Sequence, residues 1–143
     1  MDALFDTDHF SILQERRQPA CSYLEKRLQS PPVPTVKISI VSFQEQARGW
    51  LAWLHRARKP ADVLKGYYFL QGLLTWYTKF EVLPFDAAAL AEFQRLTAMK
   101  IRIGTRDLRI AAIAKVRGMT VLSRNLRDFC QVPGLVVEDW TVP

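Results

Sequence analysis

The strongest constraint on the fold of this chain is the alternation of short apolar or β-branched segments with longer segments that have helical spacing. The predicted strands are residues 2–7, 35–41, 81–85, 119–122 and 135–137. The predicted helices are residues 10–28, broken near Pro19, and residues 42–58, 61–80, 87–99 and 105–117. Alternation of this kind predicts an α/β fold with a mainly parallel sheet of about five strands flanked by helices. The length of 143 residues predicts one domain, residues 1–143.

Four acidic residues lie where predicted strands or loops meet predicted helices: Asp6, Glu45, Asp107 and Asp128. In open parallel sheets, ligands bind beyond the carboxyl ends of the strands, at the point where the strand order reverses. We therefore expect the chain to bring these four side chains to one edge of the sheet. Carboxylate oxygens are the ligands that hard divalent cations prefer, so the sequence indicates a bound metal ion.

The charge balance favours a polyanionic partner. Twenty Lys and Arg against fourteen Asp and Glu give a net charge of +6, and the isoelectric point is about 9.6. A basic surface attracts phosphates, and a small group of carboxylates within it attracts a cation that acts on them. Two cysteines form neither a disulfide framework nor a metal-ligand pair, and no apolar run is long enough for a membrane span. We expect a cytoplasmic protein with no membrane contact.

Each of the four acids also has an ordinary structural interpretation. Glu45 completes a capping box with Ser42, in which the Glu side chain reaches back to the amide of the capping residue. Asp107 in a first helical turn complements the helix dipole, and Asp128 is a solvated charge in a polar loop. Asp6 ends an apolar strand, where a desolvated carboxylate needs either a metal ion or a helix N-terminus as its partner. Only the combination of the four favours a functional site.

Two further features have weaker functional implications. His9 and His55 have neither metal-ligand nor catalytic-triad spacing, and both are expected to be surface or capping residues. Residues 67–80 carry six aromatic side chains on more than one helical face, more than a single amphipathic face can bury. Either this helix is fully buried core, or it contacts a second protein chain.

Two stretches of the sequence resemble a known family. Residues 4–13, Leu-Phe-Asp-Thr-Asp-His-Phe-Ser-Ile-Leu, and residues 103–139, which include Gly118, the run 124–129 and Pro133-Gly-Leu, closely resemble PIN-domain ribonucleases of the VapC toxin type. The resemblance implies a Mg²⁺- or Mn²⁺-dependent endonuclease that hydrolyses RNA phosphodiester bonds. It further implies inhibition by a cognate antitoxin, as in a type II toxin-antitoxin pair, and assembly into a homodimer.

The resemblance assigns the metal to the four acids, with Asp6 and Asp107 as its main carboxylates. Glu45 would then orient or deprotonate the attacking water, and Asp128 would complete the outer shell or a second metal site. In the stretch from 123 to 128 the sequence departs twice from the family pattern. Ser123 stands where the family more often has Thr, and Asn125 stands where some members have an acid. Either Asp128 or Asn125 therefore provides the fourth polar contact.

Three alternatives to the toxin interpretation remain at the level of sequence. Asp6-Thr-Asp8 mimics the motif of haloacid-dehalogenase phosphatases, although residues 103–139 lack the paired aspartates of that class. The chain could instead be a non-catalytic module that binds RNA or protein, but the presence of all four acids argues against this. Finally, a PIN nuclease without an antitoxin would serve RNA or DNA processing, and a small acidic protein encoded immediately upstream would distinguish the toxin from it.

Overall fold

The computed structural model describes residues 1–143 and contains one five-stranded sheet in which every neighbouring pair of strands is parallel. The strands are β1 (Asp2–Phe5), β2 (Thr35–Ser39), β3 (Val82–Leu83), β4 (Thr120–Leu122) and β5 (Val137–Glu138), in the order β3-β2-β1-β4-β5. The predicted parallel α/β sheet is therefore confirmed. The chain builds from β1 outward to β2 and β3 and then returns to the other side of β1, so the strand order reverses beside β1.

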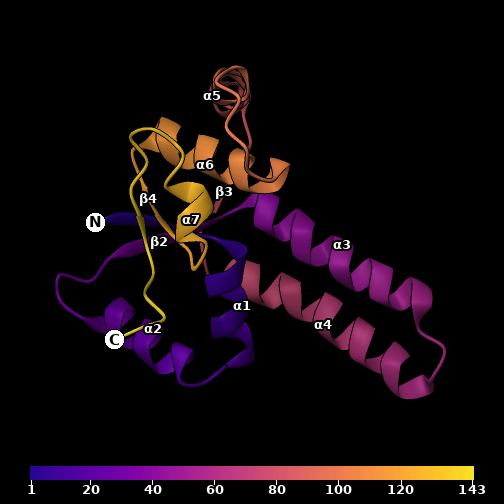
Figure 1. Ribbon diagram of the computed structural model, residues 1–143. Coiled ribbons are helices and arrows are strands. Elements are labelled where there is room, and N and C mark those ends of the chain that lie inside the picture. The colour runs from indigo at the N-terminus through magenta and orange to yellow at the C-terminus, as the bar shows by residue number, and fades with distance from the viewer.

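Seven helices connect the strands. They are α1 (Thr7–Glu15), α2 (Ala20–Gln29), α3 (Ile40–Arg56), α4 (Pro60–Thr78), α5 (Ala87–Ala98), α6 (Thr105–Arg117) and the single-turn α7 (Leu126–Phe129). Figure 1 shows that α3 and α4 form a long antiparallel hairpin that extends away from the rest of the molecule, while α5 and α6 lie together at the top of the drawing, above the start of α3. No helix combines the length and the apolar content that a membrane crossing requires.

The central strand β1 is buried on both faces because each face is covered by helices. Leu4 belongs to the core that α5 and α6 share with the sheet, whereas Ala3 and Phe5 belong to a second core with α1, α2 and α4. Helix α6 has five consecutive buried residues, Ile110–Ala114, three of which are alanines that allow close packing on all sides. Burial on both faces explains why residues 3–5 of β1 are a continuous apolar run rather than an alternating one.

The N-cap of helix α3 lies three residues before Ser42, the N-cap that the sequence predicted. Ser39 is the N-cap, and its hydroxyl accepts a hydrogen bond of 3.2 Å from the amide of Ser42. The β-branched pair Ile40-Val41, predicted to end a strand, forms the first turn of the helix. The predicted capping box of Ser42 and Glu45 is therefore wrong, and Glu45 lies in the second turn, where its carboxylate is free for another role.

The aromatic helix α4 is divided between core and surface. Tyr77 is buried, and Trp76 and Phe80 pack against the same core, whereas Tyr67 and Tyr68 are 61% and 73% exposed. Its close contact with α3 depends on Gly66, since a Cβ at this position would lie 2.5 Å from Leu54 Cδ2. The helix is thus neither plain core nor wholly free surface.

Candidate active site

Asp6 is the most buried of the four predicted site residues and lies at the carboxyl end of β1. Its Oδ1 accepts a hydrogen bond of 2.8 Å from the amide of Thr7, so it is the N-cap of α1. Its Oδ2 accepts a hydrogen bond of 2.7 Å from the hydroxyl of Ser123, which follows β4. The predicted capping role is confirmed, and it leaves the lone pairs that these two donors do not use available to a cation.

Ser123 connects the loop after β4 to the acids that follow β1. Its side chain is fully buried, and its Oγ accepts a hydrogen bond of 2.9 Å from the amide of Asn125. The same oxygen lies 3.3 Å from Asp8 Oδ2, while its shorter contact is the one to Asp6. Its own amide donates to the carbonyl of Glu138 at 3.0 Å, which fixes the residue to β5. Ser123 therefore holds Asp6 in place from the neighbouring strand.

Asn125 brings Asp107 and Asp128 together. The Asn125 amide nitrogen Nδ2 donates hydrogen bonds to Asp107 Oδ2 at 3.2 Å and to Asp128 Oδ2 at 3.0 Å. An amide NH₂ has two hydrogens, so both bonds can form at once. The sequence left open whether Asn125 or Asp128 provides the fourth polar contact, and the structure places both at the same point. Asp107 lies in the first turn of α6 and Asp128 in α7.

Glu45 approaches the other acids from α3. The hydroxyl of Thr7 donates a hydrogen bond of 2.6 Å to Glu45 Oε2 and lies 3.0 Å from the hydroxyl of Ser42. Arg106 Nη1 lies 3.7 Å from Glu45 Oε1, a long contact between partly exposed side chains. Thr7 thus joins Glu45 to the segment that contains Asp6, and the four predicted residues form one connected group.

Asp8 is a fifth carboxylate that sequence reasoning did not assign to the metal site. Its Oδ2 accepts a hydrogen bond of 2.9 Å from the amide of Arg124, and its Oδ1 lies 2.9 Å from His9 Nδ1. His9 Nε2 accepts a hydrogen bond of 3.0 Å from the amide of Trp140, so Nδ1 carries the proton and donates to Asp8. His9 is fully buried, and its predicted surface or capping position is wrong. The Asp-Thr-Asp spacing in the sequence was the signal for Asp8.

Burial and neighbouring charges raise the pKa values of Asp6 and Asp107. Burial raises the pKa of Asp6 to about 7, the charges of Asp8 and Asp107 add to the effect, and the hydrogen bond from Ser123 opposes it. The pKa of Asp107 is also raised, by burial first and then by the charge of Glu45, while the hydrogen bond from Asn125 lowers it. Grouped carboxylates of this kind disfavour their own ionised form, and a bound cation would reverse the effect.

The donor set fits a hard divalent cation, although no three His, Cys, Asp or Glu side chains converge into a preformed metal cluster. Asp6, Glu45, Asp107 and Asp128 present carboxylate oxygens, and Ser123 adds a hydroxyl oxygen. Mg²⁺ and Mn²⁺ bind through few carboxylates and retain several waters, so they do not require a closed protein cage. Asp6 and Asp107 could hold such an ion together, since the charge of Asp107 acts on Asp6.

Comparison with known sequences identifies the family. The sequence model described as "PIN domain" matches residues 3–135, which is most of the chain. The chain belongs to the PIN domain family. This assignment removes the haloacid-dehalogenase alternative, for which the structure offers no support beyond the spacing of Asp6 and Asp8.

Two curated relatives of this PIN domain match over part of their length. The tRNA(fMet)-specific endonuclease VapC of Salmonella typhimurium is 37% identical over 67 residues, which are 44% of this chain and 51% of the relative. Ribonuclease VapC1 of Rickettsia felis is 37% identical over 62 residues, which are 41% of this chain and 46% of the relative. The chain thus spans about half the length of the curated relatives it matches.

Solved structures share the fold over nearly the whole chain. VapBC-1 from nontypeable Haemophilus influenzae has a TM-score of 0.76 at 18% identity and covers 99% of this chain and 100% of its own. VapBC2 from Rickettsia felis, bound to a DNA fragment from its promoter, has a TM-score of 0.72 at 20% identity, with 98% of this chain and 99% of its own covered. At these identities the likeness shows that the PIN fold is the same.

Proposed function

We propose that this PIN domain is a metal-dependent endoribonuclease and the toxin of a type II toxin-antitoxin pair. The observation that carries the proposal is the group of carboxylates from four separate segments, Asp6, Glu45, Asp107 and Asp128, joined by hydrogen bonds at the carboxyl edge of the sheet. The ribonuclease names of the curated relatives support RNA as the substrate. The net positive charge of the chain supports a polyanionic substrate.

The protein side chains have distinct tasks in this mechanism. A bound Mg²⁺ or Mn²⁺ supplies acidification of a water and neutralisation of charge on the phosphate. Asp6 and Asp107 hold the ion, and Ser123 and Asn125 orient these carboxylates. Glu45, held by Thr7 and partly exposed, accepts the proton of the attacking water at its carboxylate.

The proposal predicts RNA cleavage that depends wholly on a divalent metal. The purified protein should cut a single-stranded or looped RNA in the presence of Mg²⁺ or Mn²⁺, and excess EDTA should abolish cutting because the phosphate charge then has no counter-charge among the carboxylates. Electrophoresis of end-labelled RNA measures the cut, with a single-stranded DNA of the same sequence as the comparison. Undiminished cutting in EDTA contradicts the proposal, and cutting of the DNA alone supports the DNA-processing alternative.

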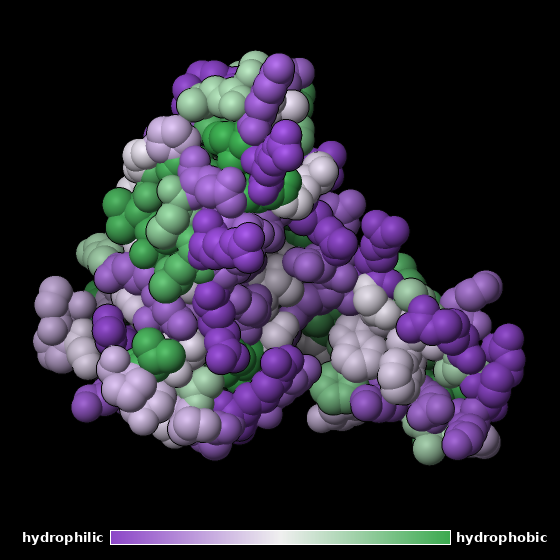
Figure 2. Space-filling model, in the orientation of Figure 1, coloured by the Kyte–Doolittle hydropathy of each residue, from purple (hydrophilic) through white to green (hydrophobic).

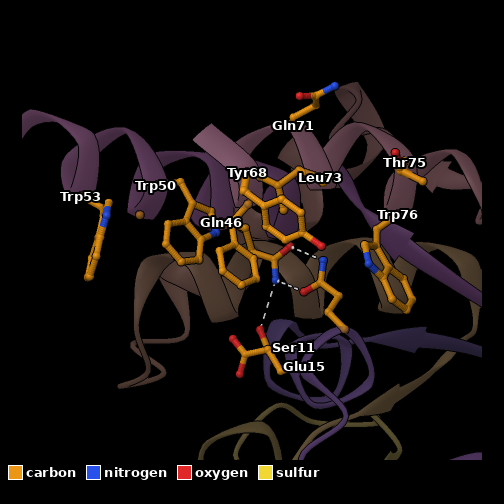
Figure 3. Close-up of a pocket in the computed structure, with 14 residues that line it drawn as sticks. Ser11, Glu15, Gln46, Trp50, Trp53, Tyr68, Gln71, Leu73, Thr75 and Trp76 are labelled. Atoms are coloured by element: carbon orange, nitrogen blue, oxygen red, sulfur yellow. Dashed lines mark hydrogen bonds between the residues drawn. The ribbon is translucent and has the colours of Figure 1, made fainter. Parts of the chain in front are cut away.

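The antitoxin is proposed to bind a groove between α1 and the α3–α4 hairpin. This groove has a volume of about 730 Å³ and is lined by aromatic side chains of both hairpin helices, among them Trp50, Trp53, Tyr68 and Trp76 (Figure 3). Trp50 and Phe69 stack with ring centroids 4.7 Å apart and planes 7° from parallel. Rigid aromatic surfaces of this kind are typical of protein interfaces. Structures named as VapBC toxin-antitoxin complexes among the similar folds support an antitoxin as the occupant.

Polar side chains form the floor of this groove. The amides of Gln14 and Gln46 form hydrogen bonds to each other at 2.6 and 3.3 Å, and Gln46 Nε2 donates to the hydroxyl of Ser11 at 3.1 Å (Figure 3). Tyr77, whose hydroxyl donates to Gln46 Oε1 at 2.9 Å, anchors this network to the core. The network fixes α1 relative to the hairpin, so the groove exists before a partner binds. A preformed groove lowers the entropic cost of binding.

Neighbouring tyrosines on α4 provide a matched test of this groove. Tyr68 lines the groove and Tyr67 does not, although both are exposed. Tyr68→Glu should weaken binding of the proposed antitoxin by about 30-fold or more, since loss of an interface hot spot costs about 2 kcal/mol. Tyr67→Glu, the control, should bind as the parent does. Isothermal titration calorimetry gives both affinities, and equal affinities for the two variants would place the antitoxin elsewhere.

A further inference from the structure

A second groove lies next to the carboxylates, between α3 and the beginning of α6. It has a volume of about 520 Å³, no hydrophobic residue lines it, and two of the site acids, Glu45 and Asp107, form part of its wall. The remaining lining residues are Gln44, Arg48, Gly104, Thr105, Arg106 and Arg109. In Figure 2 the surface between the start of α3 and α6 is hydrophilic, in contrast to the apolar patches on α5 and α6. The groove therefore continues the site away from the acids and toward basic side chains.

The three arginines of this groove are weakly neutralised. Arg48 and Arg109 form no salt bridge, and Arg106 has only the 3.7 Å contact with Glu45. Surface pairs elsewhere are closer, such as Arg95 with Glu92 at 2.6 Å. The guanidinium of Arg109 lies 5.4 Å from the ring centroid of Phe93, a cation-π contact that restricts its movement. Arg48 and Arg109 thus have no ionic partner in the protein, and Arg106 has only the long contact with Glu45.

The backbone at the end of the groove adds to this potential. Gly104 is the N-cap of the thirteen-residue helix α6 and offers no side chain to its first amides, in contrast to Asp6 at α1 and Asp86 at α5. Free amides at a helix N-terminus favour an anion. The neighbouring carboxylates of Glu45 and Asp107 instead attract a cation. The charge along the groove therefore changes from negative to positive over a short distance. Such a change in sign suits a substrate that brings both a cation and several phosphates.

We infer that the Arg48, Arg106 and Arg109 groove is a phosphate subsite that holds the RNA backbone next to the bond that is cut. The inference rests on the proposed nuclease function and adds to it the direction of the strand, which leaves the carboxylates between α3 and α6. Arginine suits this task because its planar fork donates two hydrogen bonds to one phosphate. The contacts are to the backbone and carry no base specificity.

Two arginines on α3 allow a matched test. Arg48 lines the groove, while the exposed Arg56 lies at the end of the same helix, eight residues and about 12 Å further along its axis. Arg48→Gln and Arg56→Gln are each combined with Asp6→Asn, which stops the proposed reaction. Binding to a fluorescein-labelled single-stranded RNA oligonucleotide is then followed by fluorescence anisotropy over a range of salt concentrations, and gels confirm that the RNA stays intact.

The Arg48→Gln variant should bind the RNA about tenfold more weakly at low salt, as expected for loss of one charged hydrogen-bonded contact. Its plot of log affinity against log salt should lose about 0.7 in slope, the value for one phosphate contact on a single strand. The Arg56→Gln control should change neither quantity. Arg109→Gln is a second variant with the same expected result, so the inference does not depend on one substitution.

The outcomes separate this inference from the proposed function. If the protein cuts RNA but Arg48→Gln and Arg109→Gln bind like the control, the subsite is wrong and the nuclease stands. If no RNA is cut but both variants lose affinity and slope, the arginines bind the RNA backbone, and both the nuclease and the placement of this subsite beside a cut bond are wrong. If they keep their RNA affinity and instead lose binding to the proposed antitoxin, the groove holds an acidic segment of a partner and the inference is overturned. In the cutting assay, Arg48→Gln should raise KM and leave kcat nearly unchanged.

Discussion

Asp6→Asn and Asp107→Asn are expected to reduce RNA cleavage by about a thousandfold, the scale for loss of a group that stabilises charge in the transition state. Each substitution removes a charge from a side chain that we propose to hold the metal, and it keeps the shape of that side chain. Asn is as good an N-cap as Asp, so the bond from the Thr7 amide can persist in Asp6→Asn. Initial rates of cleavage measure the loss. Either variant cutting at the parent rate contradicts the site assignment.

Asp86→Asn is the control for this comparison. Asp86 also caps a helix, accepting a hydrogen bond of 3.0 Å from the amide of Ala89, but it lies outside the carboxylate group. The Asp86→Asn variant should cut RNA at the parent rate. If replacing any capping aspartate lowered activity, Asp86→Asn would lose activity too. If Asp6→Asn loses activity because it lacks a metal ligand, Asp86→Asn keeps the parent activity.

In EDTA, Asp6→Asn should be at least as stable as the parent, although it loses activity. The folded-state pKa of Asp6 is about 7, above its usual value of 3.8, so ionisation of Asp6 disfavours the folded state. The cost is absent below pH 4, grows as the pH rises from about 4 to 7, and is complete above pH 7. Asp6→Asn removes it and should be at least as stable as the parent at pH 8, with the advantage lost at pH 4. Urea unfolding at the two pH values measures this, and a large loss of stability at pH 8 would assign Asp6 a structural role only.

The sheet could be predicted from the sequence because its strands are short apolar segments separated by helices, and that pattern permits few topologies. Boundaries were less predictable where two signals coincide. Ser39 and Ser42 are equally suitable capping residues, and Ile40-Val41 between them has strand propensity. Packing decides, since Val41 is buried in the core with α5 and α6 when it belongs to the helix. Pro84 shortened β3 to Val82–Leu83, because proline cannot donate to a strand pair.

The positions of the site acids followed from the topology, but the residues that orient them did not. Ser123 and Asp6 are 117 positions apart, and His9 and Trp140 are 131 apart. No local spacing connects such pairs, so His9 was indistinguishable from a surface histidine. The register of β1 beside β4, Phe5 opposite Leu122, places the residues that follow these strands side by side. That register brings Ser123 next to Asp6, whereas the contact of Asn125 with Asp107 also depends on how α6 packs on the sheet.

Ser123→Ala is expected to reduce cleavage at pH 7 by about 10- to 100-fold, the range for loss of a group that orients a metal ligand. The Ser123 hydroxyl donates to Asp6 Oδ2 and lowers the pKa of that carboxyl against the effect of burial. Without it, the pKa of Asp6 rises further, and the carboxylate that holds the metal forms only at higher pH. At limiting metal concentration the activity of Ser123→Ala should therefore rise at a more alkaline pH than that of the parent.

Ser123→Thr separates this effect from simple loss of packing, because Thr keeps the hydroxyl that Ala lacks. The threonine variant should cut RNA with the parent pH dependence. Saturating Mn²⁺ should reduce the difference between Ser123→Ala and the parent, since a bound cation itself favours the ionised carboxyl. If Ser123→Ala has lower activity at every pH with an unchanged midpoint, the hydroxyl serves only to fill the space between β1 and β4. A midpoint that moves to higher pH for Ala and stays for Thr assigns Ser123 the task of keeping Asp6 ionised.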